Sequence, residues 1–183
     1  MALRSTVYKA ELQIADMDRG LYETHALTLA RHPSETEERL MIRLLTFALN
    51  ADPALSFGRG LSSDDEPDLW LRDLTGAIRL WIETGLPDEK RIRRACGRAE
   101  RVLVVAYGGS KADIWWNQNA RGLGRLDNLA VMRIDAEAGT ALAALAQRSM
   151  QLSCNIQDGE VWLGTDTQGA SCTPGWLKAP SRS

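Results

Sequence analysis

Three acidic side chains, Glu66, Asp68 and Glu83, are the residues of this sequence best placed to do chemistry. They belong to two segments, 66–72 and 78–83, in which apolar and polar residues alternate with a period of two. Such alternation predicts half-buried strands, with all three acids on the polar face of the pair. Carboxylates that meet on one face of a sheet can bind a divalent cation, so the pattern indicates a Mg²⁺ or Mn²⁺ site.

The turn between these two segments decides whether the acids meet. Residues 73–76 predict a four-residue loop, which places Asp68 opposite Trp81 and diagonal to Glu83. Diagonal neighbours lie roughly 7–8 Å apart, close enough for two carboxylates to share one metal ion. The same register puts Glu66 directly opposite Glu83, where a cation, a nearby arginine or exposure must relieve the repulsion. A loop of odd length would turn one strand's side chains to the other face.

The clearest helix is expected over residues 34–51, after Pro33, with Ser34 and Glu37 as a capping box. One broad sector of this helix is apolar. The opposite sector holds Glu35, Arg39, Arg43, Thr46 and Asn50. Glu38 projects into the apolar sector, which leaves two explanations open. It extends toward the acids of the hairpin, or it reaches solvent from the first turn, where the helix dipole favours a carboxylate.

A second helix, predicted from Asp88 to about Ala99, carries a basic stripe. The stripe consists of Lys90, Arg91, Arg94, Arg98 and Arg101. A charged stripe of this kind is commonly a solvated face. The alternative is that Arg91, Arg94 and Arg98 bind the phosphates of a nucleic acid.

The rest of the chain continues an α/β pattern. The apolar run 101–107 predicts a strand buried on both faces, parallel to its neighbour and reached through the helix before it. Other elements expected are an N-terminal hairpin (6–14 and 22–30), helices at about 110–119 and 136–148, a strand at 129–134, and a C-terminal hairpin (151–156 and 160–164). Residues 1–183 are expected to form a single domain, with 174–183 as a loose tail.

Composition favours a globular protein without a membrane span. The chain is 44% hydrophobic and 25% charged, and no apolar run approaches the roughly 20 residues that a spanning helix needs. Its first residues lack the apolar core of a secretory signal, so a cytoplasmic location is expected. The net charge of −2 argues against coating nucleic acid by bulk charge but allows a local basic groove. Three widely spaced cysteines indicate neither a disulfide framework nor a Cys-x-x-Cys metal site.

From residue 34 onward the expected order is helix, strand, strand, strand, helix, strand. This order, with an Asp after a Pro on the second strand and a Glu on the third, is similar to the core of the PD-(D/E)xK nuclease-like superfamily. Five blocks across nearly the whole chain also look like the bacterial YaeQ family. These blocks are LTLARHPSETEER (27–39), DDEP (64–67), LWIETGLPDE (80–89), IWW (114–116) and IQDG (156–159).

The resemblance implies an α/β, restriction-endonuclease-like mixed sheet with an αβββαβ core in a cytosolic protein. Matched to the superfamily motif, Asp68 and Glu83 are the paired acids and Glu38 is the helix carboxylate. In that superfamily such acids hold Mg²⁺ or Mn²⁺, which activates water. One departure is that Gly85 stands where the motif has its lysine, so Lys90 or Lys111 would have to replace it.

Two functions therefore remain open from the sequence. The first is a metal-dependent nuclease in which Glu38, Asp68, Glu83 and Lys90 are catalytic and the three carboxylates bind the metal. The second is an inactive module that keeps the fold and binds nucleic acid or a protein partner, because the lysine is lost.

Overall fold

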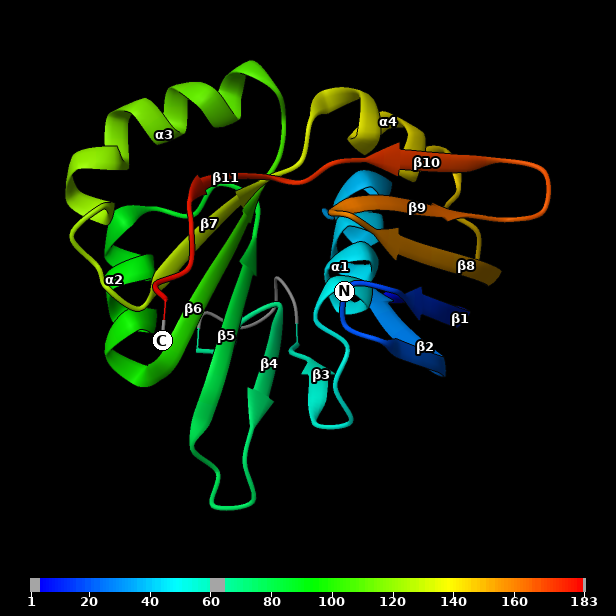
Figure 1. Ribbon diagram of the computed structural model, residues 1–183, viewed down its shortest axis with the longest axis horizontal. Helices are drawn as coiled ribbons and strands as arrows, with labels where there is room; N and C mark the ends of the chain where they lie inside the picture. The colour runs from blue at the N-terminus through cyan, green and yellow to red at the C-terminus, as the bar shows by residue number, and fades with distance from the viewer. Residues whose placement is uncertain (1–3, 60–64, 183) are drawn as a thin grey trace.

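Two mixed β-sheets and four helices make up the part of the chain that the computed structural model describes, residues 4–59 and 65–182. They form four layers in the order helices, six-stranded sheet, helices, five-stranded sheet (Figure 1). The helices are α1 (Glu37–Leu49), α2 (Glu89–Arg98), α3 (Ser110–Leu123) and α4 (Ala136–Ala144). This confirms a mixed α/β fold.

The five-stranded sheet joins the two ends of the chain in the order β10-β9-β8-β1-β2. Its strands are β1 (Thr6–Asp16), β2 (Leu21–Arg31), β8 (Ser149–Gln157), β9 (Glu160–Gly164) and β10 (Gly169–Cys172). The β1–β2 and β8–β9 hairpins confirm the two predicted hairpins. β1 and β8 pair in parallel, a contact between distant segments that no local pattern signals.

The six-stranded sheet has the order β11-β7-β6-β5-β4-β3. Its strands are β3 (Leu55–Phe57), β4 (Leu69–Arg72), β5 (Ile78–Thr84), β6 (Ala99–Ala106), β7 (Leu129–Arg133) and β11 (Gly175–Lys178). β5, β6 and β7 are parallel and are connected through α2 and α3, as the buried run at 101–107 predicted. β11 pairs with β7 where a loose tail was expected, and Lys178 donates to the Leu129 carbonyl.

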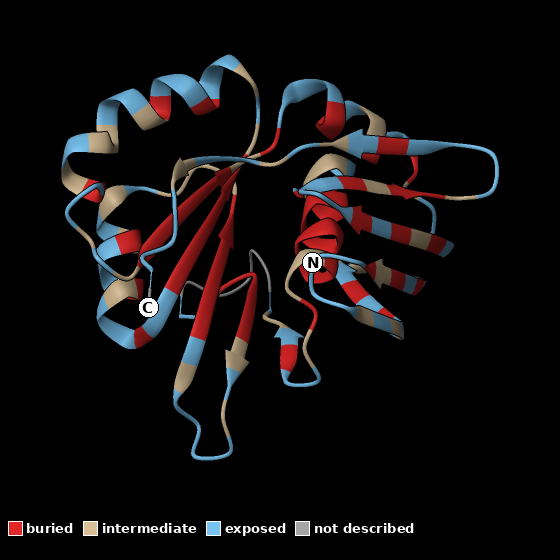
Figure 2. Ribbon diagram, in the orientation of Figure 1, coloured by how far each residue is buried: buried red, intermediate tan, exposed pale blue. Residues whose placement is uncertain are grey.

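Helix α1 lies between the two sheets and is buried along its length from Leu40 to Ala48 (Figure 2). It belongs to the larger hydrophobic core, to which the inner faces of both sheets and α4 contribute. The predicted capping box was wrong in position: Thr36 is the N-cap, and its side chain accepts from the Arg39 N–H at 3.1 Å. The helix starts later than expected because Thr36 supplies the side-chain oxygen expected from Ser34.

The β4–β5 hairpin differs from the predicted register by two residues. Leu69 pairs with Ile82 and Trp70 with Trp81, because the loop spans residues 73–77 and a bulge follows Leu71. The odd loop and the bulge each shift the register by one, so most side chains keep their predicted face. Ile78 does not: it packs on the α2 side of the sheet, whereas it was expected on the other face. The prediction that Asp68 and Glu83 share one face was also wrong, because Asp68 binds Arg39 of α1 whereas Glu83 binds Arg91 of α2.

None of the helices among the described residues is both long and apolar enough to cross a membrane.

Candidate charged site at the end of the central strands

The central strand β5 ends in Glu83 and Thr84, and Gly85 follows with a positive φ of 108°. The Gly85 N–H donates to the carbonyl of Val105 on β6, at 2.9 Å. Glu83 and Thr84 project from neighbouring positions of one strand, so they face opposite sides of the sheet. The end of β5 therefore offers polar groups both to α1 and to α2.

Asp68, just before β4, is 3% exposed, and both of its carboxylate oxygens accept hydrogen bonds. Its Oδ2 atom accepts from the Thr84 backbone N–H at 2.7 Å and from the Thr84 hydroxyl at 2.9 Å. Its Oδ1 atom accepts from the guanidinium of Arg39, on α1. Both carboxylate oxygens are thus occupied by donors of the protein.

Glu83 is 4% exposed and is held on the opposite side of the sheet. Its Oε1 atom accepts from Trp81 Nε1 at 2.8 Å and from Arg91 Nε, on α2, at 2.9 Å. Burial raises the pKa of Glu83, and the nearby negative charge of Asp68 raises it further, while Trp81 and Arg91 oppose the rise. The two acids are therefore electrostatic neighbours, although each is bound to a different arginine.

Arg39 connects Asp68 to a third buried acid, Glu35. Glu35 is 3% exposed and also accepts from Arg43 at 2.7 Å, while Arg43 donates to the Ala30 carbonyl at 3.1 Å. Burial works against a raised pKa at Arg39, but the charges of Asp68 and Glu35 outweigh it, so its pKa is raised. We call this set the charge cluster; its members are Glu35, Arg39, Arg43, Asp68, Glu83 and Arg91.

Tyr107, directly after β6, lies close enough to the charge cluster to feel its field. Burial raises the pKa of Tyr107 to about 12, with smaller contributions from Glu38, Glu35 and Asp68, and Arg39 opposes them. The phenol is therefore a neutral hydrogen-bonding group at physiological pH.

The other residues expected at the site lie elsewhere. Glu38 is half-buried against α4, so close that a Cβ on Gly139 would be 2.6 Å from its Oε1 atom. Lys90 and Lys111, the two candidates for the missing lysine, are exposed. The charge cluster thus contains Asp68 and Glu83, each bound to its own arginine, and Arg39 joins Glu35, rather than Glu38, to Asp68.

Some residues of the expected basic stripe form ion pairs or hydrogen bonds within the protein. Arg91 binds Glu83 and also donates to the Glu66 carbonyl at 3.1 Å. Arg98 is exposed, donates to the Asp65 carbonyl at 3.1 Å and lies 5.0 Å from the centre of the Trp81 ring. Arg94 and Lys90 are exposed on α2. Arg101 lies outside the helix, on β6.

A divalent cation does not fit the charge cluster as it is arranged. Both oxygens of Asp68 and one oxygen of Glu83 already accept hydrogen bonds, and Arg39 and Arg91 supply positive charge beside them. Among residues 4–59 and 65–182, no three His, Cys, Asp or Glu side chains are placed to hold a metal ion. Arranged in this way, the six charges balance one another and hold α1, the end of β5 and α2 together.

Sequence reasoning missed the contributions of Glu35, Arg39 and Arg43. Their spacing of four residues was a usable signal, because side chains four apart on a helix are neighbours and opposite charges at this spacing attract. The sequence correctly places Glu35, Arg39 and Arg43 in the polar sector of the first helix. That sector faces other parts of the protein and not solvent, however, and Arg43 is only 1% exposed.

Comparisons with known proteins agree with this structure. The profile of the family described as YaeQ protein matches residues 1–174. The chain is 49% identical to YaeQ of Escherichia coli K12 over 166 residues, which cover 91% of this chain and 92% of that protein. That relative is named an uncharacterized protein, so its name states no activity.

Two crystal structures of YaeQ proteins are also similar. The structure from Xanthomonas axonopodis pv. citri has a TM-score of 0.93 and 55% sequence identity, covering 96% of this chain and 99% of that one. The structure from Pseudomonas syringae has a TM-score of 0.91 and 37% identity, covering 96% and 97%. The chain belongs to the YaeQ family.

Proposed function

We propose that the chain is a non-hydrolytic module that binds nucleic acid, on a scaffold related to the PD-(D/E)xK nucleases. The observation that carries this proposal is that Asp68 accepts from Arg39 and Glu83 accepts from Arg91. A metal ion at either carboxylate would have to displace an arginine, and the displaced guanidinium would lose its partner. The carboxylates therefore act as anchors of the fold.

The backbone at Gly85 supports the same proposal. Gly85 occupies the position of the motif lysine, and its φ of 108° lies in a region that side chains other than glycine rarely adopt. Space is not the obstacle, because a Cβ at this position would meet nothing within 4 Å. A lysine here would require the end of β5 to take a different course.

Three exposed cations of α2, Lys90, Arg94 and Arg98, form the proposed contact with nucleic acid. Within the described part of the chain, none of them forms an ion pair with a carboxylate. Residues 90, 94 and 98 follow one another at a spacing of four, so they form one line along the helix. Such a line can track a phosphate backbone without reading base sequence.

Salt-dependent binding tests this proposal directly. Three phosphate contacts predict that log K falls with log salt with a slope of about −2 on single strands and about −3 on duplexes. The double variant Lys90→Ala/Arg94→Ala should reduce that slope by more than half. Arg4→Ala/Lys9→Ala, which removes two exposed charges from the N-terminal region, is the matched control and should leave it unchanged.

A metal-dependent nuclease is the second candidate, favoured by one observation. Asp68 raises the pKa of Glu83, so two of the three acids matched to the nuclease motif are electrostatic neighbours. The single-stranded and duplex nucleic acids of the binding test are therefore incubated with Mn²⁺ and one of three proteins: the wild type, Asp68→Asn or Glu83→Gln. Cleavage that both variants lose would overturn the non-hydrolytic proposal. Absence of binding at low salt would remove nucleic acid as the ligand and leave a protein partner.

A further inference from the structure

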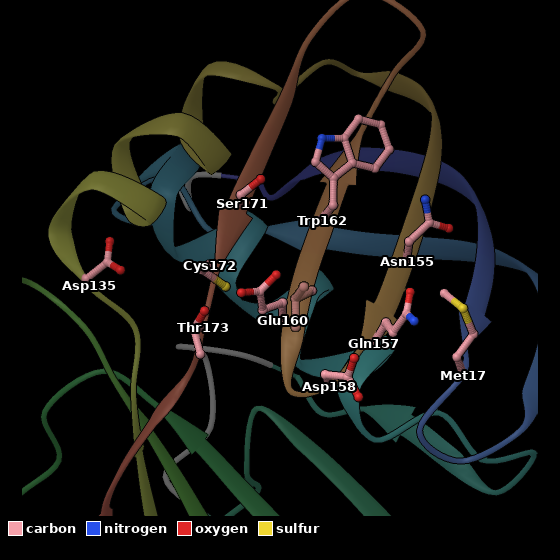
Figure 3. A pocket seen from close by; sticks show the side chains of 11 residues that line it. Met17, Asp135, Asn155, Gln157, Asp158, Glu160, Trp162, Ser171, Cys172 and Thr173 are labelled. Atoms are coloured by element: carbon pink, nitrogen blue, oxygen red, sulfur yellow. The ribbon is translucent and has the colours of Figure 1, made fainter.

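Trp162 on β9 is a large aromatic side chain that contributes to neither hydrophobic core. Its neighbours Val161 and Leu163 are buried and belong to the larger core. Because successive side chains of a strand alternate, Trp162 projects from the opposite face of the sheet, away from α1 and α4. It is half-buried, and Figure 3 shows its ring projecting from β9.

Two glycines provide a flat floor beneath the Trp162 indole. A Cβ on Gly169 would lie 2.5 Å from the indole Nε1 and Cε2 atoms, and one on Gly164 would lie 2.8 Å from Cζ2. Distances this short are not tolerated, so the ring can lie over the β9–β10 backbone only because both positions are glycine. One side of the ring is thereby supported and the ring is held in place.

Polar uncharged side chains flank Trp162. Asn155 and Ser171 are the cross-strand partners of Trp162, on β8 and β10. Together with Gln157 they line a cavity of about 660 Å³, within the usual range for small-ligand sites (Figure 3). The Trp162 Nε1–H has no hydrogen-bond partner among the described residues, so a donor is available beside the ring.

The charge of the cavity restricts the ligand class. Asp135, Asp158 and Glu160 line it, and none of its described lining residues is a lysine or arginine. Asp135 is partly engaged, because its carboxylate accepts from the Ala138 N–H at 2.7 Å. A phosphorylated or carboxylated ligand would be repelled here, whereas hydroxyl groups can donate to the carboxylates.

We propose that this cavity binds an uncharged carbohydrate, with a sugar ring stacked on the Trp162 indole. A sugar presents a face of C–H groups to the apolar ring and a rim of hydroxyls to its surroundings. Glu160 accepts from those hydroxyls, and Asn155 and Ser171 both donate and accept. This site is on the five-stranded sheet and is independent of the basic surface on α2.

Titration of the ¹⁵N-labelled 183-residue chain with neutral tetrasaccharides of glucose and of N-acetylglucosamine tests the proposal. We expect a saturable shift of the Trp162 indole N–H resonance, together with the backbone amides of Asn155 and Ser171, for at least one sugar. No shift with any sugar into the millimolar range would overturn it. A stronger response to uridine monophosphate would overturn the choice of an uncharged ligand.

Three variants separate stacking from general disruption. Trp162→Leu should weaken binding at least tenfold by calorimetry, and Gly169→Ala should weaken it because the added methyl displaces the ring. Trp176→Leu, which removes another indole that is 48% exposed on β11, is the matched control and should bind as the wild type does. Unchanged binding by folded Trp162→Leu, or equal loss in the control, would refute the site.

Discussion

Replacement of Arg39 by methionine tests whether the charge cluster holds the fold together. The substitution keeps much of the aliphatic stem and removes the guanidinium that binds Glu35 and Asp68. The three side chains are 12%, 1% and 4% exposed, so solvent screens the lost charge poorly. Removing one partner of a buried ion pair costs about 3–5 kcal/mol. We expect the lower end of that range, because Arg43 still binds Glu35 and Thr84 still binds Asp68.

Urea denaturation followed by far-UV circular dichroism measures this loss. A loss of about 3 kcal/mol corresponds to a midpoint lower by roughly 1 to 1.5 M, given typical urea dependences for a domain of this size. The control is Arg93→Met, which breaks the ion pair of Arg93 with Glu89 on the surface of α2. Exposed pairs of this kind contribute at most about 0.5 kcal/mol, so the control midpoint should move little.

A second substitution identifies the cause of the loss. If uncompensated negative charge destabilises Arg39→Met, then adding Asp68→Asn should restore part of the loss in the urea midpoint. The effects of substitutions at two residues in contact on the free energy of unfolding are not additive. An Arg39→Met protein as stable as the Arg93→Met control would refute the reasoning.

Three further predictions concern the end of β5. Because the pKa of Glu83 is raised, the native state binds more protons than the unfolded state. The free energy of unfolding therefore falls as pH rises from the ordinary carboxyl range through the raised pKa. Glu83→Gln should flatten this pH dependence in urea titrations from pH ~4 to ~7. Thr84→Val removes a hydroxyl that donates to buried Asp68 and should cost about 1.5–3 kcal/mol in the same assay, with an unchanged midpoint as the contrary result. Gly85→Lys should fold with a loss of about 1–3 kcal/mol, because its φ is positive, and should not cleave DNA; Mn²⁺-dependent cleavage by this variant would show that the lysine alone was missing.

Local patterns in the sequence were sufficient for most of the fold. The period of two found both terminal hairpins, and the apolar run at 101–107 correctly predicted a strand joined in parallel to β5 through α2. These features depend on which side chains are buried along one element, and that information is local. The β1–β8 pairing depends on contacts about 140 residues apart in the chain, which a single sequence does not specify.

The charged site was predicted less completely, for two physical reasons. The bulge after Leu71 altered the hairpin register, and bulges have no reliable sequence signal. The polar sector of α1 was read correctly as polar, but helical periodicity cannot distinguish a face toward water from a face toward buried partners. For that reason periodicity alone predicts neither that Arg39 binds Asp68 nor that Glu35 is buried beside it.

Titration of the protein with Mn²⁺ by calorimetry tests the central claim most directly, that arginines and not a metal ion neutralise Asp68 and Glu83. We predict that neither Asp68→Asn nor Glu83→Gln abolishes any saturable heat of Mn²⁺ binding that the wild type shows. One-site binding of Mn²⁺ that either substitution abolishes, while both variants remain folded, would contradict the account.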